Sequence, residues 1–191
     1  MFIRNIARVI IAVLLSLITI PSFSGIIKTD EKISLEVSRS HGFYLVKGSF
    51  DVHDSSQAVW NVLSDYDHIP NFVSSVTSSK ILERGRHALV IEQKMQGKIF
   101  LINRTFHVVL DIKERPFEKI SFKDVSRKNF VFYAGSWSIV PIDNGSRILY
   151  HLKAKPTGWA PIILGQHVFN TNISQLLNQI RTEIIRRSDG V

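Results

Sequence analysis

The chain has 191 residues, of which 45% are hydrophobic and 21% are charged. This length and composition are typical of one folded domain with a substantial core, and they exclude a disordered tail. The sequence contains no cysteine, which excludes a disulfide framework, a thiolate zinc site and a cysteine nucleophile.

The first 24 residues have the pattern of a bacterial-type signal peptide. Arg4 and Arg8 precede residues 9–20, which are apolar except for one serine and one threonine, and small residues frame a cleavage site after Ser24. An uncleaved anchor is the alternative, although this run is shorter than the about 20 residues that a spanning helix needs. We therefore expect export to the periplasm or secretion. Cleavage would remove two arginines and lower the net charge from +8 to +6.

The rest of the chain is expected to form an extension and one domain. Residues 25–42 are polar with scattered apolar positions, which predicts an N-terminal extension that is irregular or forms one short edge strand. The domain is predicted over residues 43–191. After a strand at residues 43–52, we expect Asp54 to cap a helix, with Gln57 reaching back to its first turn. Apolar side chains then follow at helical spacing, namely Val59, Trp60, Leu63 and Tyr66.

The middle of the chain alternates apolar and polar residues, as strands with one buried face do. An Asp-Asn-Gly sequence at residues 143–145 predicts a hairpin turn. We expect about six antiparallel strands, at residues 43–52, 87–96, 98–113, 118–125, 130–140 and 147–155.

The C-terminal part predicts one long amphipathic helix over residues 162–187, because this stretch lacks proline and carries an apolar stripe. The stripe consists of Ile162, Phe169, Ile173, Leu176, Ile180 and Ile184. A long helix and a sheet with one apolar face each have few ways to bury those faces. The sheet must curl around the helix or pack it on one side, which makes the fold class α+β.

Three stretches carry a resemblance to a known group of proteins. They are residues 59–73 (VWNVLSDYDHIPNFV), 130–137 (FVFYAGSW) and 150–156 (YHLKAKP). Together with the order of elements, they resemble the START-like (SRPBCC) superfamily, in its polyketide cyclase/dehydrase and coenzyme Q-binding-like group. The resemblance covers residues 43–187. It implies a helix-grip fold, in which a curved antiparallel sheet wraps around the C-terminal helix and leaves an apolar cavity between them.

Relatives in this superfamily include coenzyme Q-binding proteins, lipid and sterol transfer proteins, aromatic cyclases and a ribosome-associating toxin. Its members share packing residues and host many activities. The resemblance therefore implies a hydrophobic ligand, but it brings no catalytic residue and no cofactor.

Two polar residues share an otherwise apolar strand face, which is the informative pattern. Arg104 has the parity of Phe100 and Phe106, and Gln93 has the parity of Leu89 and Ile91. If both point inward, each needs a partner, such as a carboxylate, carbonyl or quinone oxygen of a bound ligand. The alternatives for Arg104 are a β-bulge that turns it outward, or a salt bridge to Glu92 or Asp124.

Aromatic side chains are the second class of candidate ligand contacts. An ordinary packed core is the alternative for any one of them. The predicted walls of the cavity are Phe100, Phe106, Phe122, Phe132, Trp137, Tyr150 and Phe169.

Metal, nucleotide and nucleophile motifs are absent from the sequence. No two of the seven histidines lie within five residues, and His107 and His151 have the outward parity of their strands. Asp65 and Asp67 are two residues apart, a spacing that does not place both on one helix face. We therefore predict no catalytic residue, no metal site and no cofactor.

The basic residues are scattered and serve either solubility or an anionic membrane surface. A nucleic-acid partner is disfavoured by the predicted signal peptide.

The predicted function is an exported binding or carrier protein for a lipid, an isoprenoid or quinone, or a polyketide-like compound. Loops near residues 69–73 and 156–161 would open the cavity, and Arg104 and Gln93 would orient the polar end of the ligand. One alternative is a polyketide cyclase or dehydratase, which needs an acid or base in the cavity. The other is a protein-interaction module without a ligand. A cavity of several hundred Å³ lined by these aromatic residues favours the carrier, and a filled interior favours the module.

Overall fold

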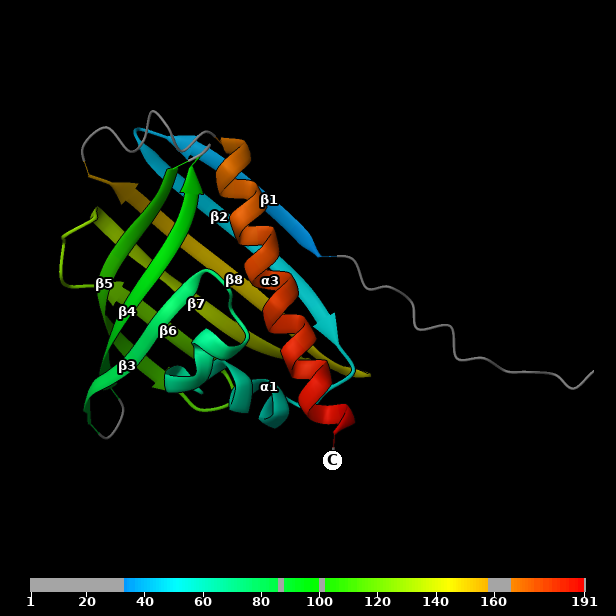
Figure 1. The fold of residues 1–191 in the computed structure, drawn as a ribbon. Coiled ribbons are helices and arrows are strands. Elements are labelled where there is room, and N and C mark those ends of the chain that lie inside the picture. The colour runs from blue at the N-terminus through cyan, green and yellow to red at the C-terminus, as the bar shows by residue number, and fades with distance from the viewer. Residues whose placement is uncertain (1–32, 86–87, 100–101, 158–165, 191) are drawn as a thin grey trace, which may run out of the picture. The chain divides into compact units, whose positions relative to one another are not determined.

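The computed structural model describes residues 33–85, 88–99, 102–157 and 166–190 (Figure 1). The predicted signal peptide lies outside these residues. The described elements are β1 (Ser34–Ser40), β2 (Phe43–Val52), α1 (Ser56–Leu63), the 3-10 helix η1 (Tyr66–Asn71), β3 (Val76–Arg84), β4 (Ala88–Ile99), β5 (Ile102–Arg115), β6 (Lys119–Asp124), β7 (Phe130–Ile142), β8 (Gly145–Pro156) and α3 (Gln166–Asp189).

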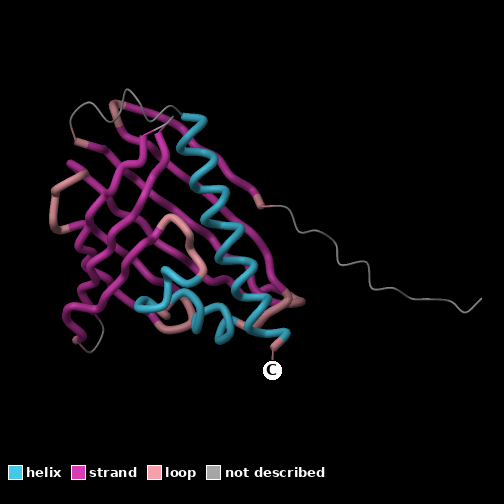
Figure 2. Tube along the Cα trace, in the orientation of Figure 1, coloured by secondary structure: helices cyan, strands magenta, loops and turns pink. Residues whose placement is uncertain are grey.

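In this part of the chain eight strands form one antiparallel sheet, in the order β1-β2-β8-β7-β6-β5-β4-β3. Strands β3 to β8 follow one another as a meander, and β2 then pairs with β8 (Figure 2). Strand β1, which falls in the predicted N-terminal extension, is the edge strand that we gave as one alternative.

Two strand predictions were wrong. The stretch 98–113 was expected to be one strand, but β4 continues to Ile99 and β5 begins at Ile102. Strand β3 was not predicted. It is an edge strand, mostly exposed, and its register with β4 shifts twice, so its sequence shows no regular alternation.

Helix α3 crosses one face of the sheet, which confirms the α+β helix-grip fold (Figure 1). Its buried apolar residues are Ile173, Leu177, Ile180 and Ile184, with Leu176 partly buried. Ile162 lies outside the described residues, as does the side chain of Phe169. In the part of the chain that the structure describes, no helix combines the length and apolar character needed to cross a membrane.

Close contact between α3 and the sheet depends on a glycine in β2. Leu177 is fully buried, and a Cβ atom added to Gly48 would lie 2.6 Å from the Leu177 Cδ1 atom. No real Cβ atom tolerates that distance. The missing side chain at position 48 therefore makes room for the leucine.

Helix α1 has a different cap from the predicted one. Ser55, not Asp54, is the N-cap residue, and its Oγ atom accepts a hydrogen bond of 3.2 Å from the Ala58 amide. Gln57 donates to Asn61 on the next turn instead of reaching back to the cap. Both Ser55 and Asp54 are good cap residues, so the sequence pattern alone does not choose between them.

Ionic contacts join the C-terminal end of α3 to the segment after α1. Arg186 and Arg187 both donate to the Glu183 carboxylate at 2.7 Å, and Arg187 also reaches the Asp65 carboxylate at 2.8 Å. The hydrogen bond from Arg186 is the largest cause that lowers the pKa of Glu183 to about 2. Burial opposes this shift, and Arg187 adds to it.

We expect Glu183→Gln to lower the free energy of unfolding by about 2 kcal/mol at pH 7. Because the folded-state pKa is depressed, the ionised carboxylate stabilises the fold above pH 4.5, and this stability is lost as the pH falls toward 2. Denaturation curves of the two proteins should therefore converge at acidic pH. Glu118→Gln is the control, because Glu118 and Arg115 form an exposed pair at 3.8 Å. A constant difference between pH 7 and pH 2 would contradict this assignment.

Candidate functional site

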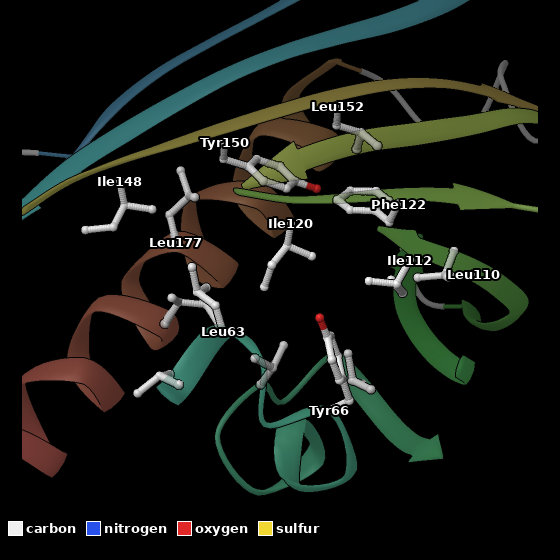
Figure 3. Close-up of a cluster of buried hydrophobic side chains, with 14 of the residues drawn as sticks. Leu63, Tyr66, Leu110, Ile112, Ile120, Phe122, Ile148, Tyr150, Leu152 and Leu177 are labelled. Atoms are coloured by element: carbon white, nitrogen blue, oxygen red, sulfur yellow. The ribbon is translucent and has the colours of Figure 1, made fainter. Parts of the chain in front are cut away.

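A cavity of about 120 Å³ lies between the sheet, the α1–η1 segment and α3. We call it the first cavity. Figure 3 shows part of its wall, with Tyr150 beside Phe122 from the sheet, Tyr66 from η1 and Leu63 from α1. Its lining residues are Val62, Leu63, Tyr66, Ile69, Val73, Ser75, Val76, Ile91, Gln93, Met95, Leu110, Ile112, Ile120, Phe122, Tyr133, Trp137, Tyr150, Leu176 and Ile180.

A second cavity of about 130 Å³ adjoins the first. The two share the lining residues Ser75, Met95, Tyr133, Tyr150 and Leu176. The second also touches Gln96, Phe106, Phe130, Leu152, Asn172 and Ile173. Each cavity is smaller than the 300–1,000 Å³ that is typical of ligand pockets. The interior is therefore neither filled nor as large as the carrier prediction expected.

The walls of both cavities are apolar with a few neutral polar groups. Their described lining includes no Asp, Glu, His, Lys or Arg. The polar side chains in the first cavity are Tyr66, Ser75, Gln93, Tyr133 and Tyr150. Such walls can hold an apolar molecule and direct hydrogen bonds to its oxygen atoms, but they offer no counter-charge to a buried ion.

Gln93 points inward from β4, as the alternation of that strand predicts. Only 8% of its surface is exposed. Its Nε2 atom donates a hydrogen bond of 3.1 Å to the Ser79 hydroxyl on β3. The partner that burial requires is thus supplied in part by the protein itself.

Tyr133 and Tyr150 form a hydroxyl pair where the two cavities meet. Burial raises the pKa of Tyr133 to about 12, and it raises the pKa of Tyr150 well above its usual range. A hydrogen bond between the two side chains raises the pKa of Tyr150 further and opposes the upward shift of Tyr133, as expected if Tyr150 donates to Tyr133. Both tyrosines stay protonated at neutral pH. Because their mutual bond uses one of the two O–H groups, one proton is left for an oxygen of a ligand.

A β-bulge at the start of β7 corrects the prediction for Phe132. The register shifts between Phe130 and Phe132. Phe132 therefore contacts Phe43 and lies under Lys153, on the opposite face of the sheet from the cavities. The same shift turns Tyr133 inward, a residue that the sequence analysis missed. An extra residue in a strand leaves no mark on the hydrophobic pattern, so no signal identified either residue.

The other predicted site residues fall into two groups. Phe122, Trp137 and Tyr150 line the first cavity, with ring centroids 4.3 Å apart for Trp137 and Tyr150, and Phe106 lines the second. Phe100 lies outside the described residues. The backbone of Arg104 pairs with Gly97, but its side chain, like that of Phe169, lies outside what the structure describes.

The two carboxylates suggested as partners of Arg104 have other contacts. The Asp124 side chain accepts hydrogen bonds from the backbone amides of Val109, Ser126 and Arg127. The Glu92 side chain bonds to His107 Nε2 at 2.7 Å. This contact joins β4 and β5 on the outer face of the sheet.

Helix α3 and the loop between η1 and β3 are held together beside the first cavity. The Ser74 amide donates to Gln179 Oε1 at 3.2 Å, and the Ser74 hydroxyl accepts from Gln179 at 2.9 Å and from Gln175 at 3.2 Å. The neighbouring residues Val73 and Ser75 line the cavity. These exposed hydrogen bonds join α3 to the loop on this side of the cavity.

The acidic residues near η1 have structural contacts. Asp65 bonds to His68 at 2.6 Å, and Asp67 accepts a hydrogen bond of 3.0 Å from the Ile81 amide. Across the described ranges, no group of His, Asp and Glu side chains has an arrangement that would hold a metal ion.

Three solved structures of similar fold illustrate the comparison. The Zhui aromatase/cyclase from Streptomyces sp. R1128 is 16% identical, with a TM-score of 0.66 over 76% of this chain and 96% of that one. A STAR-related lipid transfer protein from Xanthomonas axonopodis is 15% identical, with a TM-score of 0.60 over 78% and 98% of the two chains. Human STARD10 is 15% identical, with a TM-score of 0.61 over 82% and 74%. At these identities the likeness concerns the fold.

The sequence itself gives the assignment to a family. Among curated proteins there is no significant match. A family model described as polyketide cyclase/dehydrase and lipid transport matches residues 52–181, a range that includes α1, η1, strands β3 to β8 and most of α3. The chain belongs to the polyketide cyclase/dehydrase and lipid transport family, and its fold is that of the START-like proteins.

Proposed function

We propose that this protein is an exported carrier that encloses a neutral hydrophobic molecule bearing at least one oxygen atom. The observation that carries the proposal is the pair of adjoining apolar cavities with the Tyr133–Tyr150 hydroxyl pair at their junction. Membership of a family that includes lipid transport supports it.

The lining favours neutral ligands over ionised ones. An isolated carboxylate or phosphate would lose its hydration and meet no cation among the described lining residues, which is energetically costly. A carbonyl or hydroxyl oxygen would instead accept a hydrogen bond from the tyrosine pair or from the Gln93 amide. Isoprenoid alcohols, quinones and neutral polyketide-like compounds satisfy this condition.

The enzymatic alternative is favoured less by the described cavity. A cyclase or dehydratase needs a group that takes up or releases a proton near neutral pH. The tyrosines with raised pKa values stay protonated there, and glutamine and serine do not titrate. Enclosure and hydrogen bonding are what these side chains supply.

The small size of the cavities suggests that the loop before β3 moves when a ligand enters. An occupant larger than either cavity requires α3 and residues 69–75 to separate, and the Ser74 contacts with Gln175 and Gln179 are the hydrogen bonds that such a movement would break. These bonds are exposed, so water can replace them at little cost.

Native mass spectrometry of the protein isolated from its own host, followed by organic extraction, tests the proposal. We expect a retained mass that yields a neutral lipid-like compound. A long-chain alcohol should bind to the emptied protein at least about tenfold more tightly than the carboxylic acid of the same length. Tyr133→Phe should weaken binding of the alcohol about fivefold, because the O–H group left for the ligand is lost. Tyr44→Phe, in a buried tyrosine outside both cavities, is the matched control.

Absence of a bound compound together with equal, weak binding of both probes would contradict the carrier proposal. The same spectra test export, because cleavage after Ser24 would leave a chain that begins at Gly25.

A further inference from the structure

Three segments meet at the end of the sheet where α3 begins. They are the β1–β2 turn, the β6–β7 turn and the end of β8 (Figure 1). Phe130 pairs with Pro156, and the Thr157 amide donates a hydrogen bond of 3.0 Å to the Asn129 carbonyl. Tyr44 pairs with Ala154, so the start of β2 lies next to the end of β8.

Five basic residues gather at this end, and we call them the basic rim: Arg39, Arg127, Lys128, Lys153 and Lys155. In the described part of the chain none of them forms an ion pair with a carboxylate, although Lys128 Nζ lies 3.3 Å from His107 Nδ1. Lys153 and Lys155 instead lie over the ring of Phe43, at 4.4 Å and 5.2 Å from its centroid. Among the described residues no carboxylate therefore pairs directly with these five, and the nearest carboxylate to act on Lys128 is Glu92, through His107.

The β6–β7 turn presents two of these cations on a firmly held backbone. The buried Asp124 carboxylate accepts hydrogen bonds from the amides of Ser126 and Arg127 and from the Ser126 hydroxyl. Arg127 has a left-handed backbone conformation, with φ of 52°. This geometry leaves the side chains of Arg127 and Lys128 exposed to solvent.

Exposed apolar side chains flank the same turn. Val125 is 52% exposed and Val131 is 57% exposed, which are the two largest values among the exposed large hydrophobic residues of the described chain. Apolar side chains beside exposed cations are the combination that suits the surface of a bilayer, where the cations meet headgroups and the apolar groups enter the interface.

We propose that the basic rim docks on bilayers rich in anionic lipid. The inference rests on the carrier proposal in one respect: the second cavity, lined by Phe130 and Leu152, lies at this end of the sheet, so docking would bring it close to the bilayer. A nucleic acid is the less suitable anionic partner. The Phe43 ring is covered by lysines and is not free to stack on a base, and the exposed valines match no phosphate.

Co-sedimentation of the full chain with phospholipid vesicles tests the inference. The vesicles contain phosphatidylcholine alone, or phosphatidylcholine with about one-third phosphatidylglycerol. We expect binding to the anionic vesicles only, with affinity that falls as salt is added. Arg127→Ser combined with Lys128→Ser should weaken it about 30-fold, since each basic residue near an anionic surface contributes about fivefold.

The matched control also removes two positive charges, through Lys113→Ser combined with Arg115→Ser. These residues lie at the end of β5, beside the start of β6 and away from the β6–β7 turn. Every variant carries the same N-terminal segment, so a difference between them reports on the rim. Equal vesicle binding by the rim variant, the control and the unchanged protein would overturn the inference. Stronger rim-dependent binding to a nucleic-acid duplex than to anionic vesicles would overturn it too. Vesicle binding is measured without cargo, so its failure would leave the native mass result, and with it the carrier proposal, intact.

Discussion

Replacing Gly135 with alanine is expected to lower the free energy of unfolding by about 3 kcal/mol or more. A Cβ atom at this position would overlap the carbonyl oxygen of His151 on the neighbouring strand, and it would lie 2.6 Å from Cζ of Phe122. The phenyl ring can shift, but the carbonyl belongs to the β7–β8 pairing and cannot move without breaking it. Urea denaturation of the purified variant measures the loss.

Ser136→Ala is the control for this substitution. Ser136 is the next residue of β7 and faces the opposite side of the sheet, so its replacement should change stability by less than about 0.5 kcal/mol. Failure of the Gly135→Ala protein to accumulate in soluble form, while Ser136→Ala accumulates normally, is the extreme form of the expected result. A Gly135→Ala protein as stable as the unchanged one would show that the strands separate more easily here than the structure implies.

Leu177→Ala is expected to cost about 3 to 5 kcal/mol, because it empties a fully buried site between α3 and the sheet. Gly48→Ala should cost about 1 to 3 kcal/mol through overpacking against the same leucine. The two effects should not add. In the Leu177→Ala background the new methyl group at position 48 has room, and its cost should shrink by at least about 1 kcal/mol.

A double-mutant cycle of thermal or urea unfolding measures this coupling. Gly190→Ala serves as the control glycine, because it lies in the turn after α3, and an added Cβ atom there would only approach the Arg186 carbonyl at 3.3 Å. Strict additivity of Gly48→Ala and Leu177→Ala would mean that the Leu177 side chain does not pack against Gly48.

Regular parts of the fold could be predicted because burial imposes a period on the sequence. In β5, Val108, Leu110 and Ile112 stand two residues apart and are all buried. In β8 the same holds for Ile148 and Tyr150. The Asp-Asn-Gly turn at residues 143–145 joins β7 to β8 as expected, because few other sequences accept the backbone of a tight hairpin.

Irregular features escaped prediction because they interrupt the period or lie outside it. One added residue near the start of β7 exchanged the faces of Phe132 and Tyr133, and with them one proposed ligand contact. The inward position of Gln93 followed from alternation, but its partner Ser79 lies on β3. Because β3 is mostly exposed, its sequence does not indicate its register with β4. Leu177 could have been found, since it stands at helical spacing from Ile173, Ile180 and Ile184.

The position of β2 in the sheet has a consequence for how the chain folds. Strands β3 to β8 pair with their neighbours in sequence, and such local pairings form early. The pairing of Tyr44 with Ala154 joins residues more than 100 positions apart, and closing so long a loop costs entropy before it yields contacts. The β1–β2 hairpin is thus expected to attach late, when β8 is already in place. During synthesis β1 and β2 therefore leave the ribosome well before β8, the strand with which β2 pairs.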